Sequence, residues 1–130
     1  MTEFPFETTV PIRYADFDTL GHVNNAVYAT ILEEARIAYY EEVMDLRPTD
    51  ESLVVVHLEI DFERPLEAGP ATVRVGVESV GTKSFTMGYA VMASGERVAT
   101  AQTVMATLDP ETGRARPVPD TWRRAFGETA

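Results

Sequence analysis

The second half of the chain alternates apolar and polar side chains in separate segments, and this pattern limits the fold more than any other feature. In residues 54–63, Val54, Val56, Leu58, Ile60 and Phe62 fall on one side, and Val55, His57, Glu59, Asp61 and Glu63 on the other. A period of two is that of a half-buried β-strand. Similar alternation predicts further strands at 73–77, 85–91 and 98–108, after turns at 81–82 and 94–95.

One long helical pattern precedes these strands. Asn24 or Asn25 can cap its start, and we expect the helix to end near Asp45, roughly 20 residues or about 30 Å later. A strand at 6–14 is predicted before it and a short helix at 118–127 near the end of the chain. The helix prediction rests on apolar or small residues at helical spacing, namely Tyr28, Ile31, Leu32, Ala35, Ala38, Tyr39 and Val43.

The order of a strand, a long helix and a four-stranded meander predicts an α+β fold, with the helix covering one face of an antiparallel five-stranded sheet. The 130 residues fit one domain, 1–130. A single helix cannot cover five strands completely, so apolar surface should remain. A dimer is the simplest way to bury that surface.

Composition excludes several classes of protein. A net charge of −10 argues against nucleic acid as a partner. No apolar run approaches the length of a membrane span, and acids at Met1–Glu7 argue against a signal peptide, so we expect a cytoplasmic protein. The absence of Cys excludes disulfides and thiolate nucleophiles, and we expect neither a metal nor a cofactor. Acid-rich sequence in which Lys83 is the only lysine indicates a halophilic host or a GC-rich genome.

The segment just before the helical pattern carries the acid-base chemistry. It brings Asp16, Asp18 and His22 into a short turn together with Gly21. A carboxylate in front of a helix lies next to unpaired backbone N–H groups and the positive end of the helix dipole. It can attack or activate water while the amides hold a developing oxyanion, which suits acyl chemistry. Taken alone, Asp18 could instead cap a turn, Asp16 is more typical of a structural residue, and His22 of a packing or substrate-lining one.

The pattern Arg-Tyr-x-Asp-x-Asp-x-x-Gly-His-Val-Asn-Asn-x-x-Tyr at 13–28 resembles the hot-dog-fold acyl-CoA thioesterases of the 4-hydroxybenzoyl-CoA thioesterase family. Glu33–Arg36, Phe62–Leu66, Val80–Phe85 and the last strand fit the same family, so the resemblance covers about residues 6–110. It implies a hot-dog fold, in which a sheet wraps the long helix and two protomers join their sheets edge to edge. It also implies active sites at the dimer interface.

The resemblance further implies hydrolysis of acyl-CoA thioesters to free acid and CoA. The catalytic carboxylate of the family falls on Asp18, as nucleophile or general base, and its oxyanion-binding amide near Asn24 or Asn25. The implied partners are an acyl-CoA substrate and a second copy of the chain, in a homodimer or a tetramer of dimers. A carrier protein that is itself acidic would be repelled, which favours CoA thioesters. The implied substrate-binding residues are His22, Val23 and Tyr28, with Thr82, Lys83 and Ser84 for CoA.

Two alternative functions remain open. A hot-dog hydratase or dehydratase would use Asp18 and His22 as a dyad on a C–C bond, but the segment lacks the Asp-x-Asn-Pro-x-His type of spacing. A non-catalytic acyl-binding protein would keep the fold alone. The Asp18 carboxylate argues against this last alternative, because a binder gains nothing from a charge beside an acyl pocket.

Overall fold

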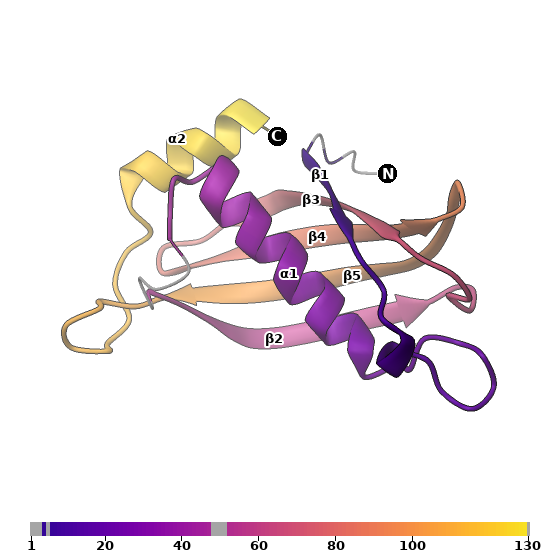
Figure 1. Ribbon diagram of the computed structural model, residues 1–130. Helices are drawn as coiled ribbons and strands as arrows, with labels where there is room; N and C mark the ends of the chain where they lie inside the picture. Colours follow the sequence, from indigo (N-terminus) through magenta and orange to yellow (C-terminus); the bar gives the residue numbers. More distant parts are fainter. Residues whose placement is uncertain (1–3, 5, 48–51, 130) are drawn as a thin grey trace.

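The computed structural model of the chain describes residues 4, 6–47 and 52–129, and within them it shows one antiparallel sheet crossed by a long helix (Figure 1). The strand order is β1-β3-β4-β5-β2. The predicted α+β fold with a five-stranded antiparallel sheet is therefore confirmed. The elements are β1 (Phe6–Val10), α1 (Val27–Glu42), β2 (Leu53–Phe62), β3 (Ala71–Val80), β4 (Ser84–Ala93), β5 (Glu96–Thr107) and α2 (Asp120–Thr129).

Two of the predicted boundaries are wrong near the N-terminus. The first strand ends at Val10, because Pro11 has no N–H to donate to the sheet, and a short 3-10 helix follows at Tyr14–Asp16. The long helix begins only at Val27, because the two asparagines before it form the entering turn. It ends at Glu42, so its 16 residues span about 24 Å. The prediction that the chain has no signal peptide rested on residues 1–7, and residues 1–3 and 5 lie outside the described part.

The alternation predicted through β2 is interrupted. Leu53 and Ile60 both pack against the core, although strict alternation would place them on opposite faces of the sheet. The pairing with β5 explains this, because it steps from Val55 opposite Met105 to His57 opposite Val104 and leaves Val56 as an extra residue. This β-bulge shifts the alternation by one residue, so that Leu53 can pack against the core on the same face of the sheet as Ile60.

The hydrophobic core lies between α1 and the sheet. From α1 it takes residues such as Ile31, Leu32 and Tyr39, and from β4 the alternate residues Phe85 and Met87, all at most 1% exposed. The helix α2 closes one end of this core with buried Trp122 and Phe126. In contrast, β2 pairs with β5 alone among the described strands. It leaves five large apolar side chains exposed, namely Val54, Val55, Val56, Leu58 and Phe62.

The register of the strands separates two ends of the sheet. At one end Phe62 pairs with Ala99, and the loop that enters α1 lies nearby (Figure 1). At the other end Leu53 pairs with Thr107, beside the turn between β3 and β4. The length of α1 separates these ends. None of the helices in the described residues is long and apolar enough to cross a membrane.

Candidate active site

A closed loop holds Asp18 at the N-terminal end of α1. An isolated β-bridge joins Phe17 to Val23 at the base of the loop. Inside it, Asp18 N donates to His22 O at 2.8 Å, and Gly21 N donates to Asp18 O at 3.2 Å. Gly21 has a φ of 80°, in the left-handed region that favours glycine. Local hydrogen bonds therefore shape the turn, and its base is also joined to a distant residue, because Val23 N donates to Leu66 O.

The two oxygens of the Asp18 carboxylate have different surroundings. Oδ1 accepts the Leu20 N–H at 2.8 Å and the His22 N–H at 3.2 Å. Within the described residues Oδ2 has no hydrogen bond, and the side chain is exposed. One oxygen thus organises the turn, while the other can reach a substrate or a water molecule.

The backbone amides at the start of α1 are mostly engaged. Asn24 N donates to Asp16 O at 2.8 Å, and Ala26 N donates to Asn24 Oδ1 at 2.9 Å. The next two amides, of Val27 and Tyr28, donate to the carbonyls of the two asparagines. Asn25 N has no acceptor in the part of the chain that the structure describes, which makes it the available oxyanion donor of the two predicted positions. Asn24 shapes the turn before the helix, and the N-cap residue of α1 is Ala26, so the predicted cap at Asn24 or Asn25 is wrong.

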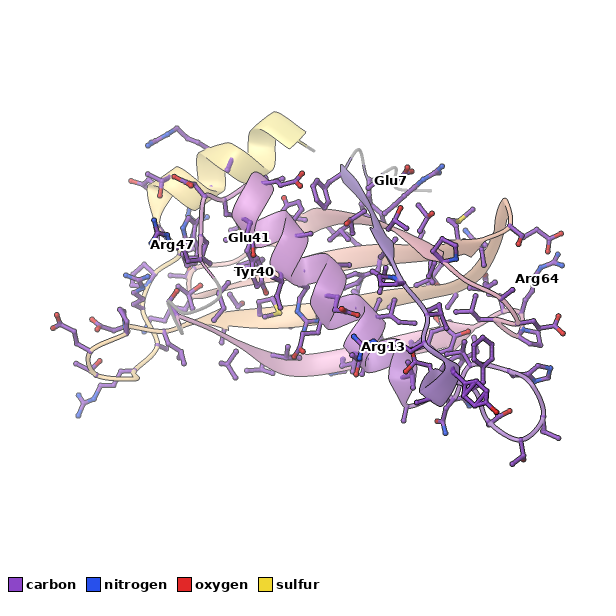
Figure 2. The ribbon with its side chains drawn as sticks, viewed as in Figure 1. Glu7, Arg13, Tyr40, Glu41, Arg47 and Arg64 are labelled. Atoms are coloured by element: carbon purple, nitrogen blue, oxygen red, sulfur yellow. The ribbon has the colours of Figure 1, made fainter. Side chains whose placement is uncertain are left out.

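Asp16 has a structural place in this loop. Its Oδ2 accepts the Arg13 N–H at 2.8 Å, and its carbonyl accepts the Asn24 N–H. The Arg13 side chain reaches Glu34 Oε1 on α1 at 3.8 Å, at the end of the helix shown in Figure 2. These contacts agree with the interpretation of Asp16 as a positioning residue.

The three predicted substrate-lining residues of this end lie at different depths. Val23 is buried and its N–H donates to Leu66 O at 2.8 Å. Tyr28 is also buried and packs edge-on against Phe62 on β2, with ring centroids 4.9 Å apart. Burial raises the pKa of the Tyr28 hydroxyl, against a hydrogen bond with the Leu66 backbone. His22 is half-buried, whereas Asp18 and Asn25 are exposed.

The turn predicted for CoA lies at the opposite end of the same protomer. It is held by Thr107 N, which donates to Lys83 O, and by Val118 N, which donates to Thr82 O, both at 2.9 Å. Arg123 of α2 donates to the carbonyl of Gly81 at 2.6 Å. The Lys83 side chain is exposed. A single protomer therefore does not bring Thr82, Lys83 and Ser84 to Asp18.

Sequence reasoning missed a pocket between α1 and the first residues of β2. It has a volume of about 310 Å³ and contains the side chains of Arg36 and Tyr40. Both residues are only 8% exposed. A signal was present in the sequence, because Arg36 follows Leu32 by one helical turn and so occupies a core-facing position. Such a position is unusual for a charged residue.

The comparison with protein families decides the identity of the fold. The model of the thioesterase-like superfamily matches residues 12–126. The chain belongs to the thioesterase-like superfamily. This thioesterase-like chain superposes on a thioesterase from Thermus thermophilus, solved with coenzyme A and zinc, with a TM-score of 0.87 and 34% identity over 99% of this chain and 96% of the other. The hot-dog fold is thereby confirmed, while the narrower 4-hydroxybenzoyl-CoA thioesterase family stays a prediction.

A second similarity concerns the activity. The thioesterase-like chain is 30% identical to a 1,4-dihydroxy-2-naphthoyl-CoA hydrolase of Synechococcus elongatus, over 92% of each chain. Together with the superfamily, this relative supports thioester hydrolysis as the activity of the chain.

Proposed function

We propose that the protein hydrolyses acyl-CoA thioesters to a free acid and CoA, with Asp18 as nucleophile or general base. The observation that carries the proposal is the unbonded Asp18 Oδ2 close in sequence to the unpaired Asn25 N–H, at the N-terminus of α1 in a thioesterase-like chain. The similar hydrolase acts on a CoA thioester and the similar thioesterase binds coenzyme A, which supports CoA as the leaving group.

Whether Asp18 acts as a base or as a nucleophile, negative charge develops on the carbonyl oxygen of the thioester. As a general base, Asp18 takes a proton from water, whose oxygen attacks the thioester carbon. As a nucleophile, it attacks the thioester carbon, and loss of the CoA thiolate leaves a mixed anhydride that water then hydrolyses. In each case the carbonyl oxygen becomes an oxyanion, which the Asn25 N–H and the positive end of α1 stabilise. The C–S bond then breaks, and the CoA thiolate leaves and takes up a proton.

The exposed strand β2 supports a homodimer as the active form. Val56 is 59% and Phe62 48% exposed, and the strand offers a ten-residue edge of backbone groups. Such an edge pairs readily with its own copy about a two-fold axis, which makes the two strands antiparallel. Pairing centred on the middle of β2 carries the Leu53 end of each protomer, with its Lys83 turn, toward the Asp18 loop of the other. CoA held at Lys83 of one protomer could then present its thioester to Asp18 of the second.

The variant Asp18→Asn tests the chemistry. Asparagine keeps the Oδ1 acceptor for the Leu20 and His22 amides, so the loop should persist, but it can neither attack nor take a proton. We expect kcat to fall at least ~100-fold, measured as release of free CoA thiol from a panel of acyl-CoAs. The matched control is Asp16→Asn, which keeps the acceptor for Arg13 N–H and should lose much less activity.

Two results would contradict the proposal. A near-normal rate in an Asp18→Asn protein with an unchanged circular dichroism spectrum would show that Asp18 performs no chemistry. If the unmodified protein released no thiol from any acyl-CoA, the hydrolase itself would be rejected. Binding of acyl-CoA without turnover would then favour the acyl-binding alternative.

A further inference from the structure

Arg36 brings a charge into the protein interior without a carboxylate partner. Its side chain leaves α1 toward the sheet and lies against the hydroxyl groups of Tyr89 and Tyr40. A guanidinium is charged at every pH at which proteins fold, and buried charges are normally paired. Among the described residues none places a carboxylate oxygen within ion-pair distance of Arg36, and Glu33 acts on it only from further away.

Tyr40 adds an unsatisfied hydroxyl beside this charge. In the described part of the chain its Oη has no well-formed hydrogen bond, although it is buried. Burial also raises the pKa of Tyr40, so that the hydroxyl keeps its proton and can donate it. Tyr89 differs, because its hydroxyl is bonded to Thr103 Oγ1 at 2.7 Å. Tyr89 therefore has a partner besides Arg36, while the Tyr40 hydroxyl, which also lies beside Arg36, has no acceptor for its proton among the described residues and can donate it to a ligand.

Both groups open into the pocket of about 310 Å³ between α1 and β2. Its volume suits about ten groups of water size, at ~30 Å³ each. The walls are mainly apolar, and Arg47 adds a second guanidinium at its rim. Figure 2 shows Tyr40 on the C-terminal half of α1 and Arg47 beyond the end of the helix, both away from Arg13. The apolar lining consists of Ile37, Leu46, Leu53, Val54, Val55 and Met105.

The polar end of this pocket offers hydrogen-bond donors almost exclusively. A guanidinium has five N–H donors and no acceptor, and the protonated Tyr40 hydroxyl has no acceptor of its own in the described structure. Among the residues that the structure describes, Glu33 is the one acidic side chain in the lining, and it is exposed. A ligand that completes the site must therefore carry oxygen acceptors, and a negative charge on them would balance Arg36.

We propose that the pocket formed by Arg36 and Tyr40 binds a carboxylate at the far end of the acyl group. The substrates would then be CoA thioesters of dicarboxylic acids. This inference rests on the proposed function, in which antiparallel pairing of β2 brings the pocket of one protomer toward the Phe62 end of the other, where Tyr28 and the Asp18 loop lie. The acyl chain would run along the apolar walls from the thioester to Arg36.

The kinetic test compares hexanoyl-CoA with adipyl-CoA, in which a carboxylate replaces the terminal methyl group. In the unmodified protein we expect the larger kcat/KM for the carboxylated substrate. The variant Tyr40→Phe should lower the ratio of the two kcat/KM values ~10-fold, and Arg36→Met should lower it ~100-fold, as expected for lost hydrogen bonds to a charged group. Tyr40→Phe removes only an unpaired hydroxyl, so it should fold normally. Arg124→Met, at an exposed position on α2, is the matched control and should leave the ratio unchanged.

Glu33 gives a test of opposite sign. Its carboxylate lines the same pocket and would repel a bound carboxylate. Glu33→Gln should therefore raise the preference for the carboxylated substrate a few-fold, while a merely structural pocket would show no change. A ratio that stayed constant in Tyr40→Phe, Arg36→Met and Glu33→Gln would overturn the proposal.

Binding without turnover separates this inference from the hydrolase itself. By calorimetry, adipate should bind the intact dimer more tightly than hexanoate, and Tyr40→Phe should remove the difference. If that pattern held but no acyl-CoA released thiol, the pocket assignment would stand and the hydrolase would fail. If the protein hydrolysed both thioesters equally and bound both acids equally, the hydrolase would stand and the pocket assignment would fail.

Discussion

The two ends of α1 carry polar groups that are organised in opposite ways. At the N-terminal end, most hydrogen bonds of residues 16–25 join residues that are close in the sequence, and the Asp18 carboxylate is exposed. At the C-terminal end, Arg36 and Tyr40 are buried and depend on side chains from β4 and from the first residues of β2. The first region is a local structure and the second is a product of the tertiary fold.

In the proposed mechanism this difference separates reaction from specificity. The loop would position Asp18 and the Asn25 amide in the same way for every substrate, so the same chemistry could serve many acyl groups. The polarity of the pocket at the other end is set by individual side chains from several elements, so a single substitution can change it. Substitutions there should alter which acyl group is preferred and leave the hydrolytic step in place.

The largest effect should come from separating the two regions without touching either. Val56→Glu places a charge at the most exposed apolar position of β2, and pairing centred on the middle of the strand would bring it next to Glu59 of the second copy. Like charges brought together at an interface cost several kcal/mol, so we expect a mass near 14.4 kDa instead of twice that value. Loss of substrate positioning should lower kcat/KM ~100-fold. Light scattering and thiol release measure the two effects.

Thr9→Glu is the control for this experiment. It introduces the same charge at an exposed position of β1, the opposite edge of the sheet, and should leave both mass and rate unchanged. A dimeric and active Val56→Glu protein would show that β2 is not the interface. The comparison between the two ends of α1 would then have to be made within one protomer.

A smaller effect is expected when only the loop is strained. An alanine side chain at Gly21 would meet no other atom within 4 Å, but the φ of 80° is unfavourable for it. We expect Gly21→Ala to lower the free energy of unfolding by about 1–2 kcal/mol and to lower the rates with hexanoyl-CoA and its carboxylated counterpart by the same factor.

Gly127→Ala provides the reference for the Gly21 variant. Gly127 lies in α2 with similar open space and no positive φ, so alanine should stabilise the protein by up to about 1 kcal/mol. Thermal unfolding and the two rates distinguish the outcomes. If Gly21→Ala changed the ratio of the two rates, the loop would also contribute to acyl preference, and the separation of roles would be wrong.

The smallest effect concerns the buried hydroxyls at the other end. Burial raises the pKa of Tyr40 above its ordinary value of 10.0, so the folded protein keeps a proton that the unfolded chain loses. The stability from this group is complete below about pH 10 and declines above it. Raising the pH from 9 to 11 should therefore lower the free energy of unfolding of the unmodified protein by about 1 kcal/mol more than that of Tyr40→Phe. Thermal unfolding at the two pH values, with exposed Tyr14→Phe as control, tests this; equal losses in both variants would contradict it.

The sequence predicted the fold wherever a pattern was local. Alternation of two and of 3.6 residues located the four later strands and the helix. It failed at Val56, because a bulge depends on pairing with β5, and at Asn24 and Asn25, because both residues suit a cap and a turn equally. Periodicity describes one segment at a time and carries no information about its partner strand.

The candidate site divides in the same way. The motif of the loop predicted Asp18 as the catalytic residue, which stays a prediction, and it could not distinguish the Asn24 amide from that of Asn25, since the difference lies in the bond from Asn24 N to Asp16 O. The pocket was missed because Arg36 becomes buried through Tyr89 and Leu53, which are distant in the sequence. A charged residue at a core position of a helix is the signal that sequence reading should follow in such cases.

The exposed edge of β2 also has consequences for the newly made chain. Leu53–Leu58 contains three consecutive valines and no charged residue other than a titratable histidine, a composition that favours fibril-like stacking when its edge stays open. Glu59 and Asp61 follow directly on the same strand and oppose such stacking by mutual repulsion. Subunits at low abundance would spend longer with this edge uncovered, so apparent thermal stability and solubility should both increase with protein concentration.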